Sequence, residues 1–225
     1  MIRYIKTIFL YFIEKLSTWI GCAFIYYNHP LKIKTYRLCA SIKDDSRTLL
    51  SVHELYVLYQ AAFASLKIKG ELAEVGVYKG GSAKLLCILK GNKHIYLFDT
   101  FRGLPSTTKK DDSYHREGMY QEHMESVAEY LKMFKNVILQ KGLFPRSASC
   151  IINKRFCFVH LDIDLYKGTL DALNFFWPRL NKGGIIFLHD YPVLMGVKNA
   201  VYKFCKQKNV SVIEIPPAQA VIIKI

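Results

Sequence analysis

Closely spaced cysteine pairs are absent from this 225-residue sequence. Its six cysteines are scattered, none forms a C-x-x-C pair, and most lie in apolar stretches. Zinc fingers and thioredoxin-like redox centres need such pairs, whereas a lone cysteine in an apolar stretch behaves as a small hydrophobic residue. The sequence therefore favours a reducing, cytoplasmic setting.

Acidic residues are scarce relative to basic ones. The chain has 18 Asp and Glu against 32 Lys and Arg, a formal net charge of +14 at pH 7. A positive field attracts phosphates, nucleic acids or anionic lipids without selecting among them. The basic residues form no arginine-rich run, and there is no RNP-like aromatic motif. We therefore predict no nucleic-acid partner, and we expect the lysines to attract an acidic or nucleotide-linked substrate.

No apolar run reaches the length of a membrane span. Residues 2–27 are apolar and aromatic, but Glu14 and Lys15 interrupt them before the ~20 residues that a span needs. We expect an amphipathic helix on the inner face of the membrane or on a partner subunit. Arg3, Lys6 and Lys15 would suit anionic headgroups. A helix packed on its own domain and a true span or signal peptide are the alternatives.

Hydrophobic residues make up 51% of the chain, enough for one α/β domain with a real core. From residue 71 onward, apolar runs of strand length alternate with segments of helical periodicity. We predict strands at 71–77, 94–99, 136–141, 156–163 and 184–189. We predict helices at 48–69, 81–90, 121–134, 145–152, 166–180 and 195–207. This alternation is typical of a parallel sheet built from βαβ units.

The C-terminal segment 210–225 breaks this alternation. It holds two β-rich runs separated by Pro216 and Pro217, with no room for a crossover helix. The last strand is therefore predicted to be antiparallel. The whole pattern predicts a Rossmann-like α/β fold of the class I methyltransferase type, a seven-stranded, mostly parallel sheet with helices on both faces. We assign residues 1–47 to an N-terminal extension and residues 48–225 to this domain.

A glycine-rich loop follows the first predicted strand, within E-V-G-V-Y-K-G-G-S (74–82). Glycine lets a backbone turn tightly and approach a ligand closely. The spacing G-x-x-x-G-G is not the G-x-G-x-x-G of a nicotinamide dinucleotide site. Glu74, an acid at the end of a central strand, can hold the ammonium group of an amino-acid-like ligand. A glycine turn without a ligand is the alternative.

Further polar and aromatic residues follow the next two strands, where doubly wound sheets bind ligands. Asp99 ends the second strand and can accept both hydroxyls of a ribose; a helix cap or turn is the alternative. After the third strand, Gly142 and Phe144 offer a wall for an adenine ring, although Phe144 alone is typical of a core. The polar segment 103–120 is predicted to form a loop over this site.

Four titratable residues end the fourth and fifth strands: Asp162, Asp164, His189 and Asp190. Two carboxylates two residues apart on a strand share a face, and crowding them beside an apolar core is costly unless a cation or a proton intervenes. We therefore predict a metal or proton-transfer site; a capped turn at His189 is the alternative. His160, on the fourth strand, is predicted to be a core histidine.

Six motifs are spread over the predicted domain. They are EVGVYKGGS (74–82), FDTFRGLP (98–105), SVAEYL (126–131), LDIDLYKGTLDAL (161–173), WPRLNKGG (177–184) and HDY (189–191). With these motifs the chain, over about residues 48–225, resembles the macrocin O-methyltransferase (TylF-like) family of S-adenosylmethionine-dependent sugar O-methyltransferases. The most specific pair is F-D-T-F-x-G-L-P with L-D-x-D-x-Y.

The resemblance implies S-adenosylmethionine as the cofactor. The glycine loop and Glu74 would bind its methionine and ribose side, and Asp99 its ribose hydroxyls. The residues implied in cofactor binding are Glu74, Gly76, Val77, Tyr78, Gly80, Ser82, Asp99, Thr100, Gly142, Phe144 and Asp162.

The resemblance also implies a divalent metal, usually magnesium, at Asp162, His189 and Asp190, with Asp164 as the general base. The family more often has an acid in the place of His189. Imidazole is a poor ligand for magnesium and a good one for manganese, iron or zinc. Mg and Mn are therefore both candidates.

The implied function is transfer of a methyl group to a hydroxyl of a sugar or glycoside. Two alternatives are methylation of a catechol-like phenol or of a membrane glycolipid, the latter suggested by residues 2–27. A third is a non-catalytic module that binds the cofactor or a partner enzyme, suggested by His189. Each of these functions allows a homo-oligomer.

Overall fold

The computed structural model describes residues 13, 17 and 29–225. The chain divides into two units, Met1–Arg37 and Leu38–Ile225, and helix α2 (Pro30–Asp44) runs across the division. The helix predicted at residues 2–27 lies outside the described residues apart from positions 13 and 17. Its contact with a membrane or a partner therefore stays a prediction.

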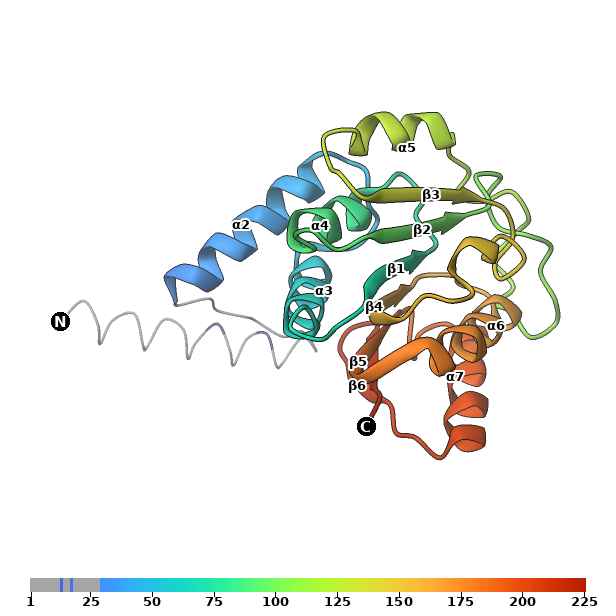
Figure 1. Cartoon of the computed structure of the whole chain (residues 1–225). Helices are drawn as coiled ribbons and strands as arrows, with labels where there is room; N and C mark the ends of the chain where they lie inside the picture. Colours follow the sequence, from blue (N-terminus) through green and yellow to red (C-terminus); the bar gives the residue numbers. More distant parts are fainter. Residues whose placement is uncertain (1–12, 14–16, 18–28) are drawn as a thin grey trace. The chain divides into compact units, whose positions relative to one another are not determined.

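The second unit contains a seven-stranded sheet (Figure 1). Its strands are β1 (Glu71–Val75), β2 (Ile95–Asp99), β3 (Val137–Lys141), β4 (Phe156–Leu161), β5 (Leu180–His189), β6 (Ile213–Ile215) and β7 (Gln219–Ile223). The spatial order is β3-β2-β1-β4-β5-β7-β6. Neighbouring strands are parallel, except that β7 runs antiparallel to both β5 and β6. This order confirms the predicted fold, including the reversed last strand.

Helices connect the strands of this unit. They are α3 (Val52–Ser65), α4 (Gly81–Leu89), α5 (Met124–Leu131), α6 (Tyr166–Phe176) and α7 (Met195–Lys208), with short 3-10 turns η1 (Ser149–Ile151) and η2 (Trp177–Arg179). The helix predicted at 145–152 is wrong, because only η1 forms there. Pro145 lacks a backbone N–H, and the serines that follow it favour turns over helix.

The fifth strand begins earlier than its sequence pattern indicated. β5 starts at Leu180 and not at residue 184. The glycines in between belong to the strand because the Gly183 N–H donates to the carbonyl of Lys224, and the Lys224 N–H donates to that of Gly184. Backbone pairing with the chain end thus extends the strand through residues of low β-propensity.

The two faces of the sheet bury different side chains, because successive residues of a strand point to opposite faces. Helices α6 and α7 cover one face, over a core rich in phenylalanine that includes Phe98, Phe156 and Phe176. Helices α3 and α4 contact each other and the sheet over the alternate strand residues, which are also buried. Burying one such phenylalanine stabilises the folded state by roughly 1.5–3 kcal/mol. The burial of these side chains therefore holds α6 and α7 against the sheet.

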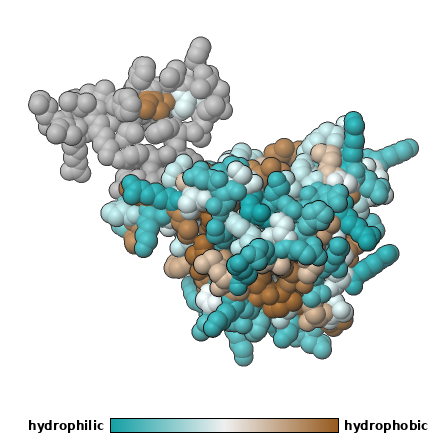
Figure 2. Space-filling model, turned by 90° about the horizontal axis from the view of Figure 1, so that it is seen from above, coloured by the Kyte–Doolittle hydropathy of each residue, from teal (hydrophilic) through white to brown (hydrophobic). Residues whose placement is uncertain are grey.

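The surface is mostly hydrophilic on the face that Figure 2 shows, with a brown area where apolar residues reach the surface. Of the described lysines and arginines, only Lys90 is buried. The basic excess is therefore displayed to solvent, where its field can act on charged ligands. Among the described residues, no helix is both long enough and apolar enough to cross a membrane.

The ends of β1 and β4 approach each other closely at Gly76. This glycine has a φ of +87°, and a Cβ on it would lie 1.7 Å from the carbonyl oxygen of Asp162. The Gly76 N–H donates to the carbonyl of Phe98, and the Asp162 N–H donates to that of Val75, both at 2.9 Å. Only glycine lets the two strand ends meet here, and it places the residues after β1 beside those after β4.

We expect Gly76→Ala to destabilise the protein far more than Gly118→Ala. Both glycines have a similar φ, +87° and +84°, but nothing lies within 4 Å of a Cβ at Gly118. The control carries only backbone strain, about 1–3 kcal/mol, whereas Gly76→Ala adds a clash with the backbone and should cost more than about 4 kcal/mol. Urea unfolding measures both, and equal losses would contradict the close approach at Gly76.

Candidate active site

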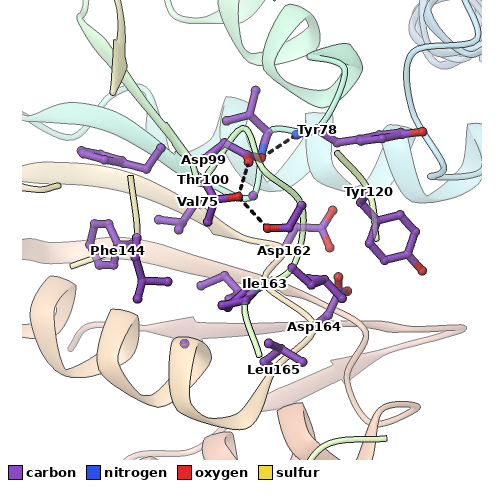
Figure 3. Close-up of a pocket in the computed structure, with 18 of the residues that line it drawn as sticks. Val75, Tyr78, Asp99, Thr100, Tyr120, Phe144, Asp162, Ile163, Asp164 and Leu165 are labelled. Carbon is purple, nitrogen blue, oxygen red and sulfur yellow. Dashed lines mark hydrogen bonds between the residues drawn. The ribbon is translucent and has the colours of Figure 1, made fainter. Parts of the chain in front are cut away.

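A cavity of about 480 Å³ opens at the carboxyl ends of the parallel strands. Its walls come from the loops that follow β1 to β5 and from the segments 47–50 and 103–120. Doubly wound sheets bind ligands at this edge, and the volume suits a small organic molecule. Figure 3 shows Phe144 on one side of the cavity and Asp164 and Tyr120 toward the other, with Asp99 and Asp162 between them.

Asp99 joins the loops that follow β1 and β2 (Figure 3). Its Oδ2 accepts hydrogen bonds from the N–H groups of Val77 (2.8 Å) and Tyr78 (2.9 Å), and its Oδ1 accepts one from the N–H of Phe101 (2.8 Å). Tyr78 and Phe101 both have positive φ, +48° and +50°, a conformation that these bonds hold in place. The Thr100 hydroxyl lies 3.5 Å from Oδ1 but donates its hydrogen to the carbonyl of Gly103 at 2.6 Å. A carboxylate has about four acceptor positions, so Asp99 can still accept a hydroxyl of a ligand.

The structure brings most of the predicted cofactor residues to the cavity. Those that line it are Gly76, Val77, Tyr78, Ser82, Asp99, Thr100, Gly142, Phe144 and Asp162. Gly80 lies outside the lining and is the N-cap of α4, with a φ of +88°. Phe144 packs against Phe98 and Phe176, with ring centroids 5.1 and 5.2 Å apart. It is therefore a core residue whose remaining surface faces the cavity.

Glu74 does not reach the cavity. Its side chain is fully buried, and its Oε1 lies 2.9 Å from Nδ1 of His160, its neighbour across β1 and β4. Strand alternation gives the reason: Val75 lines the cavity, so the residue before it points to the other face of the sheet. The predicted contact of Glu74 with a cofactor lacks the geometry it needs, and His160 is a core histidine.

His189 lies among three carboxylates. Its Nδ1 is 3.2 Å from Oδ1 of Asp162 and 3.1 Å from Oδ1 of Asp190, and its Nε2 is 3.2 Å from Oε1 of Glu54. Burial disfavours charge on the imidazole, but the three carboxylates outweigh burial and raise the pKa of His189. Burial also opposes ionisation of Asp162, yet His189 lowers the pKa of this carboxyl. The carboxylates around His189 therefore favour a positive charge among them, on the imidazole or on a bound cation.

Asp164 lies beside this group in a left-handed backbone conformation. Its φ is +64°, and that of Asp190 is +62°. Burial, the negative charge of Asp162 and the proximity of Asp190 raise the pKa of Asp164 well above its usual range. Residues with such a backbone gather at functional sites. Asp164 thus combines a place in the cavity wall with a raised pKa, which makes it a stronger base than an ordinary carboxylate.

The three predicted metal ligands fit a divalent cation. Asp162, His189 and Asp190 each offer one ligand atom, and these atoms lie within 4.8 Å of one another. Nδ1 of His189 is buried and has no hydrogen-bond partner, although two carboxylate oxygens lie within 3.2 Å of it. Two ligands held at right angles, each about 2.1 Å from a cation, are about 3.0 Å apart. Short distances without hydrogen bonds therefore suit atoms that share a cation.

The loop predicted at 103–120 lines the cavity. Asp111 and Asp112 anchor it by accepting hydrogen bonds from backbone N–H groups at the starts of α6 and α7. The rings of His115 and Tyr120 pack edge to face, with centroids 6.3 Å apart. Burial first, and then nearby aspartates, raise the pKa of Tyr120. The loop thus brings an aromatic wall to the acidic residues.

The sequence patterns did not reveal Glu54 or the segment 47–50 as parts of this region. Residues 47–50 line the cavity, and Arg47 holds them by donating to the carbonyl of Lys79 at 2.7 Å. Glu54 carries a local signal only as the third helical residue of a capping box that Ser51 begins. A capping box explains a helix start and gives no sign of a contact 135 residues away.

The strand order and the cavity at the carboxyl edge of the sheet together define a class I methyltransferase fold. Residues 53–216 match the profile of the Macrocin-O-methyltransferase (TylF) family, and the chain belongs to this family.

The individual relatives share 28% or fewer of the aligned residues with this chain. The chain is 28% identical over 142 residues to the 8-demethyl-8-(2,3-dimethoxy-alpha-L-rhamnosyl)-tetracenomycin-C 4'-O-methyltransferase of Streptomyces olivaceus, covering 56% of this chain and 54% of the relative. It is 23% identical over 186 residues to the mycinamicin III 3''-O-methyltransferase of Micromonospora griseorubida, covering 74% and 73%. The chain thus spans about half the length of the first relative. The solved structure of the O-methyltransferase NovP aligns with a TM-score of 0.72 at 19% identity, over 79% of this chain and 82% of that one, and supports the fold.

We expect Asp99→Asn to destabilise the protein by about 1–3 kcal/mol. The amide would turn N–H donors toward a backbone N–H from which Asp99 now accepts a hydrogen bond. Asp44→Asn makes the same change of charge at an exposed position and should cost less than about 0.5 kcal/mol. Urea unfolding at neutral pH compares the two. A loss in Asp99→Asn no larger than in the control would show that this carboxylate does not hold the loops.

Proposed function

We propose that the protein is an S-adenosylmethionine-dependent O-methyltransferase that methylates a hydroxyl of a sugar or glycoside with the help of a divalent metal. One observation carries the proposal: Asp99 and Phe144 line the same cavity as Asp162, Asp164 and His189. Family membership supports it, as do two relatives named for O-methylation of a rhamnosyl tetracenomycin and of mycinamicin III.

The part of the cavity that Asp99 and Phe144 line would hold the cofactor. Asp99 keeps an acceptor position for a ribose hydroxyl, and Phe144 offers an apolar ring to the adenine. S-Adenosylmethionine supplies, when bound, a methyl group on a sulfonium. The residues of the chain then have two tasks, which are to align the acceptor hydroxyl and to remove its proton.

Asp164 is the residue proposed to take that proton. It lines the cavity two positions after Asp162, and its raised pKa makes it a stronger proton acceptor than an ordinary carboxylate. A divalent metal held by Asp162, His189 and Asp190 would supply the Lewis acidity that lowers the pKa of a sugar hydroxyl. Asp164 is placed to accept a proton from such a hydroxyl.

The acceptor is proposed to be a sugar that carries negative charge or a nucleotide. Arg146 and Lys167 line the cavity together with Tyr114 and Tyr120. Cationic side chains at a cavity raise the local concentration of anionic ligands, and aromatic rings offer apolar faces to a sugar ring. The dispersed lysines of the surface act in the same direction.

Several finer points stay predictions. A catechol-like phenol would use the same base and metal chemistry, and a glycolipid acceptor or membrane contact depends on residues 2–27, most of which lie outside the described part of the chain. We propose residues 48–225 as the catalytic domain. Cytoplasmic location and homo-oligomerisation also remain to be tested.

We expect Asp164→Asn to bind S-adenosylhomocysteine as the wild type does and to lose methyl transfer. The amide keeps the shape of the carboxyl but cannot take a proton, and general base catalysis is worth about 10²–10⁴-fold in rate. Calorimetry measures binding, and transfer of a radiolabelled methyl group to a panel of glycosides and nucleotide sugars measures turnover. Asp44→Asn, at an exposed position, is the control for the change in residue type.

The outcomes of this experiment separate the alternatives. A wild type without affinity for the cofactor, or full turnover in Asp164→Asn, would contradict the proposed function. Turnover of catechols but not of glycosides would favour the phenol alternative. Affinity without turnover on any acceptor would favour a non-catalytic binding module.

A further inference from the structure

Glu54 approaches the acidic residues from outside the cavity. It lies on α3, and its Oε1 accepts a hydrogen bond from Nε2 of His189 at 3.2 Å. Its side chain is buried and is not part of the cavity lining. Glu54 is therefore not placed to touch a substrate or a cofactor, but it can act through the imidazole of His189.

The Glu54 carboxylate is fixed in this direction. Its Oε2 accepts hydrogen bonds from the N–H of Ser51 at 2.8 Å and from the Ser51 hydroxyl at 2.7 Å, within the capping box of α3. The backbone carbonyl of Glu54 accepts a further hydrogen bond from the side-chain amide of Gln219 on β7 at 3.0 Å. These bonds hold the carboxylate with its Oε1 facing Nε2 of His189.

An acceptor at Nε2 determines which ring nitrogen of a neutral His189 carries the hydrogen. The hydrogen lies on Nε2, where it bonds to Glu54, and the lone pair lies on Nδ1. This nitrogen is buried, lacks a hydrogen-bond partner and lies 3.2 Å from Asp162 and 3.1 Å from Asp190. Metal-binding histidines commonly donate their second ring N–H to a carboxylate, which fixes the tautomer and the ring orientation.

We propose that Glu54 holds His189 in the tautomer whose Nδ1 binds a metal, and that the resulting site takes Mn²⁺ in preference to Mg²⁺. The inference rests on the proposed function, since it presupposes the metal site. Mg²⁺ favours an octahedron of oxygen ligands and keeps several waters, whereas imidazole nitrogen suits transition ions.

The competing arrangement has a protonated His189 in the place of the metal. Such an imidazolium would balance part of the charge of the three carboxylates. It would also place a hydrogen on Nδ1, a buried atom with no hydrogen-bond partner although carboxylate oxygens lie 3.1 and 3.2 Å away. A buried donor left without a partner is costly, so the geometry favours the metal.

Metal binding to the full-length chain tests the proposal, with Mn²⁺ followed by electron paramagnetic resonance and Mg²⁺ measured by competition. We expect the wild type to bind Mn²⁺ at least ~10-fold more tightly than Mg²⁺. We also expect nitrogen modulation from His189 in the pulsed spectrum of bound Mn²⁺. His189→Asp should abolish this modulation and shift the preference toward Mg²⁺.

Glu54→Gln tests the role of the carboxylate. The glutamine carbonyl oxygen has to stay on the N–H of Ser51, so its amide NH₂ turns toward Nε2 and moves the hydrogen of His189 onto Nδ1. We expect the affinity for Mn²⁺ to fall about 10–100-fold. The matched control is Glu71→Gln, which removes the same charge beside His94, an exposed histidine outside the cavity, and should leave the affinity unchanged.

Ser51→Ala separates the tautomer from the stability of the helix. It removes the hydroxyl of the capping box but keeps the Ser51 N–H and the Glu54 carboxylate. We expect a lower midpoint of urea unfolding, with the Mn²⁺ affinity within about twofold of the wild type. An equal loss of Mn²⁺ affinity in Ser51→Ala and Glu54→Gln would overturn the proposal, as would unchanged affinity in Glu54→Gln.

Preference of the wild type for Mg²⁺, or binding of neither metal, would also overturn the proposal. Calorimetry with S-adenosylhomocysteine on the same samples tests the proposed function separately, because Phe144, the proposed wall for the adenine, lies apart from Asp162 and Asp164 in the cavity (Figure 3). A chain that binds Mn²⁺ as expected but not S-adenosylhomocysteine would support the role of Glu54 and defeat the proposed function.

Discussion

The meeting of β1 and β4 at Gly76 is the constraint on which the site depends. A side chain there would overlap the backbone at Asp162, and its absence lets the two strand ends exchange hydrogen bonds with their neighbours. The loop after β1, held by Asp99, therefore stands beside the loop after β4, which carries Asp162 and Asp164. One cavity then offers a fixed carboxylate, an apolar wall and a cluster of acids (Figure 3).

The carboxylates around His189 can be buried only because positive charge compensates their negative charges. Three carboxylates surround His189, and breaking such a buried group by removing one partner leaves an uncompensated charge. The third carboxylate, Glu54, also completes the capping box of α3, so the start of a helix and the orientation of an imidazole depend on the same side chain. Residues that hold a site in this way are part of its chemistry even when no ligand touches them.

Much of this architecture follows from local sequence patterns. The parallel strands, the reversed β7 and the cluster of Asp162, His189 and Asp190 follow from runs of apolar residues and from acids at strand ends. Glu74 shows where such reasoning stops, because one step along a strand turns a side chain to the opposite face, and the predicted strand end at residue 77 lies two residues beyond the observed one. Glu54 could not be predicted as a partner of His189, since only the tertiary fold joins α3 to β5.

The most direct test of the whole account is a crystal structure of the chain with S-adenosylhomocysteine and Mn²⁺, with anomalous scattering recorded at the manganese edge. The account predicts the nucleoside between Asp99 and Phe144, and an anomalous peak bounded by Asp162, Asp190 and Nδ1 of His189. A nucleoside bound elsewhere, or no manganese peak and an imidazole hydrogen-bonded to Asp162 through Nδ1, would contradict it.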